Sequence, residues 1–524
     1  MKFLVEQIKT SINSTDEDIL EIARARILKT RALSHIKNMY LYKRSIDARH
    51  KDDIKFVSTV CIEADTMGKK PSFEIMKRYF IKPLAEDELK LSLHGKMPDN
   101  PPLIVGFGPA GMFCALALAR AGLNPVVIER GADVDTRVER VNSFHTTKKL
   151  DLNTNIQFGA GGAGTFSDGK LTTRINDPKC SFVLKMLVEH GAPTDIMYKA
   201  KPHIGTDLLR GIVKSIDKEI RALGGKILYN TKLLSFDDKR AVTNVGEIAY
   251  SSIVLAIGHS ARDTYDYLMN SGFSVEPKPF SVGVRIEHLQ ADINEAMYGK
   301  YAGDSRLGAA DYNVSHRLND RGVYSFCMCP GGEVVCASSE EESVVVNGMS
   351  TYARDGKNAN SAIAVQVNRE DYGADPKKGI EFQRMLEKKA FISAGSNYNA
   401  PMQTLGDFYE NKAVSEPKRI MPSYMNSNVT VCDMNGILPK FVCDYLKLGF
   451  HEFAKKINGF DAKDVPITGV ETRTSAPLRI LRNENYTAFA HSNVYPCGEG
   501  AGYAGGIMSA AVDGINVALA ILKK

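Results

Sequence analysis

Residues 103–131 read LIVGFGPAGMFCALALARAGLNPVVIERG, and this stretch decides the fold of the chain. Leu103 to Val105 predict a short apolar strand, and Met112 to Ala121 predict an alanine-rich helix that ends before Gly122. Pro125 to Ile128 predict a second apolar strand. The stretch is therefore a β-α-β unit within about 30 residues.

A glycine motif joins the first strand to the helix, and an acidic residue ends the second strand. The motif is Gly106-Phe107-Gly108-Pro109-Ala110-Gly111, and the acidic residue is Glu129. The first glycine permits a tight turn, the second lets backbone approach a pyrophosphate, and the third lets the helix pack on the strand. The helix N-terminus favours phosphate, and the carboxylate can accept hydrogen bonds from a ribose. A glycine turn without a ligand is the alternative, but the complete β-α-β context favours a dinucleotide.

This motif alone does not separate FAD from NAD, and three further features favour FAD. The nucleotide motif opens the α/β region, and a matching glycine segment, Cys497 to Ile507, stands at the far C-terminus before an alanine-rich helix. That helix N-terminus could face a pyrophosphate or a flavin edge. Between them, residues 159–171 (GAGGAGTFSDGKL) form a loop whose small residues leave room for a flat ring.

The pattern of the remaining chain predicts an α/β protein with several parts. Residues 1–97 read as a small α+β domain, with a helix over 16–32 that starts at Ser14 or Thr15 and two strands within 39–64. After a proline-rich linker, we predict a discontinuous, Rossmann-like FAD domain interrupted by a mixed, β-rich cap or substrate domain. The predicted boundaries are 98–274 for the first FAD part, 275–465 for the cap and 466–524 for the second FAD part.

Composition indicates an ordinary globular protein. The chain has 524 residues, 44% of them hydrophobic, and a formal net charge of +6, which does not by itself imply a nucleic-acid or membrane partner. Charged residues interrupt the N-terminal apolar positions, and no apolar run reaches the roughly 18–20 residues of a membrane helix. Nine dispersed cysteines without CxxC pairs favour reduced thiols. We therefore expect a cytoplasmic protein without a metal site.

Several long motifs carry a resemblance to a known family. ERG at 129–131, AIGHSAR at 256–262 and GEGAGYAGGIMSAAVDG at 498–514 resemble the two-part FAD domain of the glutathione-reductase superfamily. Within it, the chain resembles the uncharacterised FAD-dependent dehydrogenase family, whose motifs are similar to GAGGAGTFSDGKL, KPFSVGVRIEH, YSFCMCPGG, ETRTSAPLRI and YPCGEGAGYAGGIMSAA of this chain. The resemblance covers nearly the whole chain. It implies FAD and a redox role, and it supplies no substrate.

The resemblance also implies roles for particular residues. The first glycine motif meets the pyrophosphate, Glu129 and Arg130 hold the adenosine ribose region, and Arg137 is a further phosphate contact. Glu499 stands where many relatives have an aspartate that bonds the ribitol. The predicted cofactor-binding residues are Gly106, Gly108, Pro109, Ala110, Gly111, Glu129, Arg130, Gly131, Arg137, Gly162, Gly164, Thr165, Phe166, Ser167, Asp168, Lys170, Leu171, Leu233, Leu234, Ala256, Gly258, Glu499, Gly500, Gly505, Gly506 and Ile507.

Three residues are candidates for the chemistry itself. Residues i and i+2 of a strand face the same side, so Cys327 and Cys329 could form a dithiol relay near the flavin. Their alternative role is packing, because free cysteine often behaves as a small hydrophobic residue. Arg285 could hold a carboxylate or stabilise an anionic reduced flavin, and interdomain salt bridging is its alternative. His203 and His259 could transfer protons, or simply pack.

The sequence thus predicts an FAD-dependent oxidoreductase that transfers hydride between flavin N5 and an unidentified small molecule. No CxxxxC is present, and we predict no second Rossmann domain for NAD(P)H, so NAD(P)H is expected at most as a transient electron donor. A flavin monooxygenase is one alternative. Another is an RNA-binding or RNA-modifying flavoprotein that uses the basic stretches ARARILKTR and YKRSIDARHK of residues 1–97, although charge runs of this size are usually solvated faces.

Overall fold

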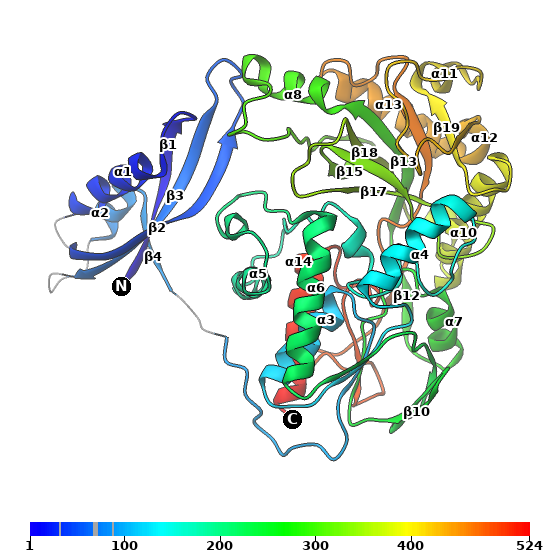
Figure 1. The fold of residues 1–524 in the computed structure, drawn as a ribbon, viewed down its shortest axis with the longest axis horizontal. Coiled ribbons are helices and arrows are strands. Elements are labelled where there is room, and N and C mark those ends of the chain that lie inside the picture. The colour runs from blue at the N-terminus through cyan, green and yellow to red at the C-terminus, as the bar shows by residue number, and fades with distance from the viewer. Residues whose placement is uncertain (31–32, 67–71, 86–88) are drawn as a thin grey trace.

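The computed structural model describes residues 1–30, 33–66, 72–85 and 89–524. The protein is a mixed α/β protein with several sheets, and Figure 1 shows three regions that follow one another along most of the chain. The N-terminal region stands to one side of a larger body. This body contains the glycine motifs and a β-rich region.

The N-terminal region is a four-stranded sheet with two helices. Its elements are β1 (Lys2–Ser11), α1 (Asp16–Leu28), β2 (Leu33–Asp47), β3 (Lys55–Thr66), α2 (Phe73–Arg78) and β4 (Ile81–Leu84). The strand order is β2-β3-β1-β4, and each pair is antiparallel. Thr15 is the N-cap of α1, since its side chain accepts from the Asp18 N–H and the Asp18 carboxylate accepts from the Thr15 N–H. The start and the two predicted strands are confirmed, whereas β1 was not predicted.

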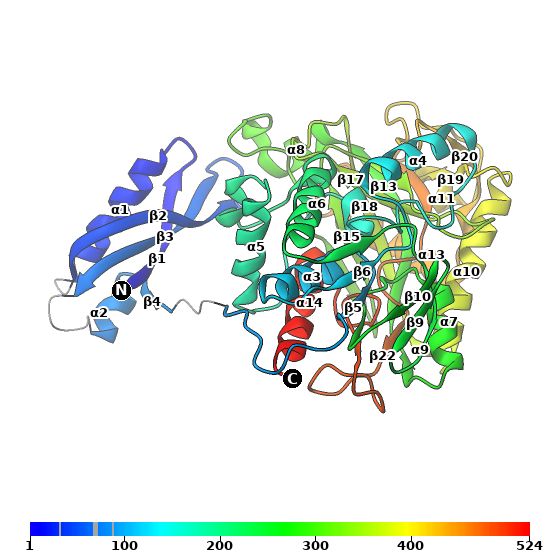
Figure 2. The same ribbon diagram turned by 60° about the horizontal axis from the view of Figure 1, so that its bottom comes forward.

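One contact between the N-terminal region and the body runs along an edge of β2. The Arg44 N–H donates to the Tyr198 carbonyl at 2.7 Å, and the Ala200 N–H donates to the Arg44 carbonyl at 2.8 Å. The Arg44 guanidinium lies 5.1 Å from the centre of the Phe56 ring and pairs with Asp16. Figures 1 and 2 both place α5 (Lys179–Glu189) on the side of the body that faces this region.

The region that carries the glycine motifs is built on a five-stranded parallel sheet. Its order is β23-β11-β5-β6-β7, so β23 from the C-terminal segment pairs with β11, a strand formed some 240 residues earlier. The strands are β5 (Leu103–Val105), β6 (Val126–Ile128), β7 (Lys226–Leu228), β11 (Ile253–Leu255) and β23 (Val494–Pro496). The predicted β-α-β unit is therefore present as β5, α3 and β6.

Helices pack against this sheet, and small residues let two of them come close. The helices are α3 (Pro109–Arg120), α4 (Val134–Thr147), α5, α6 (Gly205–Ala222), α7 (Arg262–Asn270) and α14 (Ile507–Leu522). A Cβ at Gly514 of α14 would lie 2.1 Å from the Ala110 carbonyl oxygen of α3, so this crossing requires glycine. A three-stranded antiparallel sheet, β10-β9-β8, is attached to the region and comprises β8 (Leu233–Phe236), β9 (Arg240–Thr243) and β10 (Gly246–Ala249).

The β-rich region is a seven-stranded sheet with helices around it. The sheet order is β14-β15-β18-β13-β21-β19-β20. Its strands are β13 (Phe280–Leu289), β14 (Ser315–Leu318), β15 (Arg321–Cys329), β18 (Asn358–Val367), β19 (Ala400–Thr404), β20 (Val429–Val431) and β21 (Pro466–Glu471). Its helices are α8 (Gln290–Tyr298), α9 (Arg369–Tyr372), α10 (Pro376–Ser393), α11 (Leu405–Glu410), α12 (Met434–Ile437) and α13 (Lys440–Ala454). Two further strand pairs are β12 (Val275–Pro277) with β22 (Leu478–Ile480), and β16 (Gly332–Cys336) with β17 (Val346–Ser350).

One strand departs from the predicted division of the chain. We assigned residues 466–524 to the second FAD part, whereas β21 pairs with β13 and β19 inside the seven-stranded sheet. Both of those pairings are antiparallel, and all six residues of β21 are buried. The apolar side chains of β21 therefore belong to the core of the β-rich region. Across the described residues, no helix combines the length and the apolar character needed to cross a membrane.

Candidate functional site

A single large cavity joins the three glycine-rich segments to the β-rich region. Its volume is about 1190 Å³, slightly above the usual range of about 300–1,000 Å³ for small-molecule and cofactor sites. The predicted residues that line it are Gly106, Gly108, Pro109, Ala110, Glu129, Arg130, Gly162, Gly164, Ser167, Asp168, Lys170, Leu233, Ala256, Gly258, Cys327, Glu499, Gly505, Gly506 and Ile507. Segments separated by almost 400 residues thus converge on one space.

The first glycine turn is shaped by close backbone contacts. Gly106 has a φ of +101°, and a Cβ there would lie 2.4 Å from the Ala256 carbonyl oxygen. A Cβ at Gly111 would lie 2.0 Å from the Gly106 carbonyl oxygen. These two glycines are required by the turn and by its packing on neighbouring strands. Gly108, by contrast, faces the cavity at the N-cap of α3.

Glu129 joins the turn to the central glycine loop. Its carboxylate accepts from the N–H groups of Phe107 at 2.8 Å, Gly131 at 3.0 Å and Gly159 at 2.9 Å. A carboxylate has about four acceptor positions, so one position remains for a ligand hydroxyl. Glu129 is 5% exposed and lines the cavity.

Arg137 has a different place from the predicted phosphate contact. Its side chain is fully buried, and its guanidinium donates to the carbonyls of Asn155, Ile156, Ala160 and Gly162 at 2.7–2.9 Å. Burial holds the pKa of Arg137 below its usual range, to about 9. Since these carbonyls occupy the donors, Arg137 holds the glycine loop in shape behind the cavity wall.

Several other predicted residues outside the lining support the wall from behind, whereas Leu234 is exposed to solvent. Gly131 and Gly500 lie in tight backbone contacts, where a Cβ would approach Gly159 and Gly258 to 2.6 Å. The Phe166 ring lies between the guanidinium groups of Arg137 and Arg210, at 4.8 and 5.2 Å. The residues that the structure places outside the lining are Gly111, Gly131, Arg137, Thr165, Phe166, Leu171, Leu234, Gly500, Arg285 and Cys329.

Asp168 lines the cavity, and its carboxylate is bonded within the protein. Its carboxylate accepts from the Arg354 guanidinium at 3.0 and 2.5 Å and from the Ser350 hydroxyl, and it lies 3.4 Å from Lys170 Nζ. Burial opposes ionisation, but Lys170 and Arg354 hold the pKa of Asp168 below its usual range. Asp168 therefore joins the glycine loop to the β-rich region and leaves Lys170 beside the cavity.

The β-rich region contributes a buried ion pair at the cavity. The Arg285 guanidinium donates to both Glu471 carboxylate oxygens, at 2.5 and 3.0 Å, and to the Cys327 carbonyl at 2.9 Å. Arg285 is completely buried, whereas Glu471 reaches the lining. Burial raises the pKa of Glu471 to about 7, although Arg285 opposes the rise. A carboxylic acid that titrates near neutral pH can accept or supply a proton.

Two further titratable groups lie along the lining. Burial raises the pKa of Glu499 to about 7, while the Lys278 ammonium opposes this rise. Burial, with the nearby Arg473 and Arg262 cations, lowers the pKa of His259 to about 3, so this imidazole is neutral at pH 7. Lys278 opens the motif KPFSVGVRIEH, and Glu471 opens the motif ETRTSAPLRI. The spacing of these motifs in the sequence did not predict a role for either residue.

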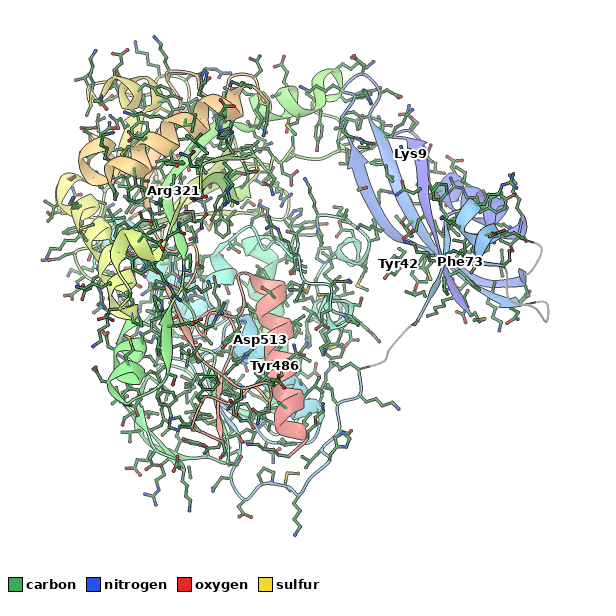
Figure 3. All side chains as sticks on the ribbon, turned by 180° about the vertical axis from the view of Figure 1, so that it is seen from behind. Lys9, Tyr42, Phe73, Arg321, Tyr486 and Asp513 are labelled. Atoms are coloured by element: carbon green, nitrogen blue, oxygen red, sulfur yellow. The ribbon has the colours of Figure 1, made fainter. Side chains whose placement is uncertain are left out.

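The C-terminal glycine segment leaves open space along the cavity. A Cβ at Gly505 or Gly506 would meet no atom within 4 Å among the described residues. Asp513 of α14 fixes the segment, since it accepts from the Gly498 N–H and from Arg482, both at 2.7 Å. Figure 3 shows Asp513 beside Tyr486, whose ring centre lies 4.6 Å from the Arg482 guanidinium. Two helix N-termini, open glycines and one remaining Glu129 acceptor position fit a dinucleotide with a flat ring.

Comparisons with known proteins identify the cofactor. Residues 279–474 match the family described as "FAD-dependent protein, C-terminal domain-like", and residues 4–63 match a domain of unknown function, DUF8436. FAD is therefore the cofactor. An uncharacterized protein of Clostridium beijerinckii is 46% identical over 528 residues, covering 98% of each chain. Within the described residues, no group of three or more His, Cys, Asp or Glu is arranged to hold a metal ion.

Solved structures resemble the chain only loosely. Halogenase PltM in complex with phloroglucinol and FAD is 12% identical, with a TM-score of 0.35 over 81% of this chain and 68% of that one. Glycine oxidase from Geobacillus kaustophilus is 11% identical, with a TM-score of 0.33 over 81% and 95%. A thioredoxin reductase from Gloeobacter violaceus is 17% identical, with a TM-score of 0.18, and the chain covers 34% of its length.

Proposed function

We propose that this chain, which belongs to the same family as the Clostridium beijerinckii protein, is an oxidoreductase that transfers hydride between FAD and a small molecule. Bound FAD supplies the hydride chemistry, and the protein supplies orientation and charge. One observation carries the proposal. The cavity continues from the glycine segments to Tyr324, Asn347 and Arg473 of the β-rich side, which leaves a polar compartment for a substrate.

The residues on the cavity wall have separable tasks. The N-termini of α3 and α14 present N–H groups to phosphate and ring oxygens, and Glu129 offers its remaining acceptor position to a ribose hydroxyl. Glu471 and Glu499 can exchange a proton with a substrate because their pKa values are raised to about 7. Lys278 gives the substrate compartment positive charge, which suits a carboxylate or another anion.

Flavin content tests the cofactor site. In Gly505→Leu, the new Cβ meets no described atom within 4 Å, so we expect the protein to fold while the leucine side chain fills the space for the flavin. We expect FAD affinity to fall at least about 100-fold, equivalent to about 2.7 kcal/mol. Gly211→Leu is the matched control, because Gly211 of α6 also has open space around its Cβ but does not line the cavity. Equal FAD content in both variants would show that FAD binds elsewhere.

Anaerobic reduction tests the reaction class. The FAD-loaded protein is mixed with NADH or NADPH, and loss of the flavin absorbance is followed in time. Reduction by a nucleotide or by a small-molecule substrate, followed by reoxidation with a non-oxygen acceptor, supports the proposal. Oxygen uptake coupled to insertion of oxygen into a substrate, without any such acceptor reaction, assigns the protein to the monooxygenases instead.

A further inference from the structure

The end of strand β15 is bent at the two cysteines. Phe326 lies opposite Ala362 and Cys329 opposite Asn360, so Cys327 and Met328 together face the single residue Ser361. This is a β-bulge, and Cys327 has a φ of +45° within it. A residue other than glycine rarely occupies this left-handed region, and such positions cluster at functional sites.

The bulge gives the two thiols unequal surroundings. Cys327 lines the cavity, whereas Cys329 is completely buried behind it. The Cys329 thiol lies 3.2 Å from the Cys327 carbonyl oxygen and within hydrogen-bonding reach of the Cys327 sulfur. A regular strand would present residues i and i+2 alike on one face, so the difference between the thiols comes from the bulge.

Charges around Cys327 favour its thiolate. The hydrogen bond from Cys329 holds the pKa of Cys327 below its usual range, burial opposes this, and the Lys170 and Arg285 cations add to the lowering. Three carboxyl groups also face this thiol. Asp168 raises the pKa of Cys327, and the charge on Cys327 in turn raises the pKa values of Glu471 and Glu499. The hydrogen bond to Cys327 and burial raise the pKa of the Cys329 thiol.

Lys170 is the cation best placed to act on this thiol. Its Nζ is shielded from solvent and has no hydrogen-bond partner among the described residues, and its nearest carboxylate, Asp168, is already bonded by Arg354. Cys497 lines the same cavity, but burial together with Asp513 raises the pKa of its thiol although the Arg482 cation opposes the rise. The lowered pKa is therefore specific to the Cys327 position and not a property of the cavity.

From this arrangement we infer that Cys327 and Cys329 are a redox-active dithiol and that the substrate class is a small disulfide, an inference that rests on the proposed FAD-dependent function. The Cys327 thiolate attacks one sulfur of the disulfide, forms a mixed disulfide and releases the first thiolate. Cys329 then loses its proton and attacks the Cys327 sulfur, which releases the second thiolate and leaves a Cys327–Cys329 disulfide. Two electrons and two protons return this disulfide to the dithiol, and reduced FAD is the donor of the electrons.

Thiol chemistry tests the pair without reliance on catalysis. The fully reduced protein is incubated with oxidised glutathione, quenched with acid, alkylated and digested for mass spectrometry. We expect a Cys327–Cys329 disulfide in the wild type, a trapped glutathione adduct on Cys327 in Cys329→Ser, and neither product in Cys327→Ser. Cys180→Ser is the control, because Cys180 is a partly exposed thiol of α5 outside the cavity lining, and it should form the disulfide like the wild type. A wild type without this disulfide overturns the inference.

The pH dependence of alkylation tests the role of Lys170 as a positioning residue. The rate at which iodoacetamide modifies Cys327 is measured by mass spectrometry from pH 5 to 9. In Lys170→Met, we expect the midpoint to rise by at least about one pH unit and the rate below the midpoint to fall about tenfold. Lys170→Arg should restore the wild-type midpoint. Identical profiles for wild type and Lys170→Met contradict the proposed electrostatic role.

Electron counting separates this inference from the proposed function. After treatment with oxidised glutathione and removal of the excess, the FAD-loaded wild type should take up two more electrons per FAD than Cys327→Ser during anaerobic titration with dithionite, because the disulfide is a two-electron couple. Equal uptake by two proteins with normal flavin spectra rejects the dithiol and leaves the flavoenzyme intact. A protein that forms the disulfide but never binds FAD rejects the proposed function and retains the thiol pair.

Discussion

Glu387→Gln should be among the most destabilising single substitutions in the larger body. Glu387 of α10 is fully buried and receives two bonds from Arg262, at 2.8 and 2.9 Å, and two from Arg473, at 3.1 and 2.8 Å. These arginines are 2% and 3% exposed, so the substitution leaves two buried cations without their shared anion. Removing one partner of a buried ion pair costs about 3–5 kcal/mol.

The lower end of that range applies, because Arg262 also pairs with Glu340. We therefore expect a loss of about 3 kcal/mol in the free energy of unfolding, measured by guanidinium chloride denaturation. At an unfolding entropy of about 2.1 cal/mol/K per residue, this loss lowers Tm by about 3 °C for a chain of this length. Glu342→Gln is the control, since Glu342 and its partner Lys388 are 66% and 61% exposed, and it should change stability by less than about 1 kcal/mol.

Acid provides an internal check of the same reasoning. Burial opposes ionisation of Glu387, but Arg262 and Arg473 hold its pKa below the usual range. A lowered folded-state pKa gives stability that is present above the unfolded value and is lost as pH falls through the folded value. The difference between wild type and Glu387→Gln should therefore be largest near neutral pH and shrink in acid. If Glu387→Gln and Glu342→Gln cost the same at pH 7, the structural role assigned to Glu387 is refuted.

Three other predictions address the loop, the cavity and the N-terminal region. Arg137→Lys loses most of the donors to the glycine loop and should lower the free energy of unfolding by about 3 kcal/mol, whereas the exposed Arg140→Lys should not, as denaturation curves will show. Burial raises the pKa of Glu499 to about 7, so its contribution to stability is fully present below about pH 4.5 and falls as pH rises to about 7. Glu499→Gln should remove this part of the pH profile of ligand-free protein, and the exposed Glu484→Gln should retain it. In gel-shift assays, the full chain should not bind RNA in a salt-sensitive way. The reason is that arginines of its N-terminal region pair with carboxylates, namely Arg24 with Glu21, Arg44 with Asp16 and Arg49 with Asp47. RNA binding that Arg24→Ala or Arg49→Ala abolishes would restore the RNA-binding alternative.

The sequence could predict those features that depend on local backbone requirements. The β-α-β unit follows from apolar runs and from glycines whose Cβ positions are occupied by neighbouring carbonyls, as at Gly106 and Gly111. Arg137 was misplaced because its acceptors are carbonyls of a loop that begins 18 residues later, and nothing in the spacing shows them. Likewise, the apolar strand at 466–471 reads the same in either region, and only its pairing with β13 assigns it.

The cysteine pair shows most clearly where the sequence pattern ends and tertiary structure begins. Alternation along a strand predicts two equivalent thiols on one face, and equivalent thiols would compete for the same chemistry. The bulge instead turns Cys327 to the cavity and leaves Cys329 behind it, so one thiol can meet a substrate while the other remains protonated nearby. The Lys170 ammonium comes from a loop more than 150 residues earlier in the chain. It lies beside Asp168, whose carboxylate is fixed by Arg354. The reactivity of Cys327 therefore depends on both the bulge and the Lys170 ammonium. A variant that straightens the strand should lower the exposure of the Cys327 thiol to the cavity, and a variant that removes the ammonium should raise its pKa, each independently of the other.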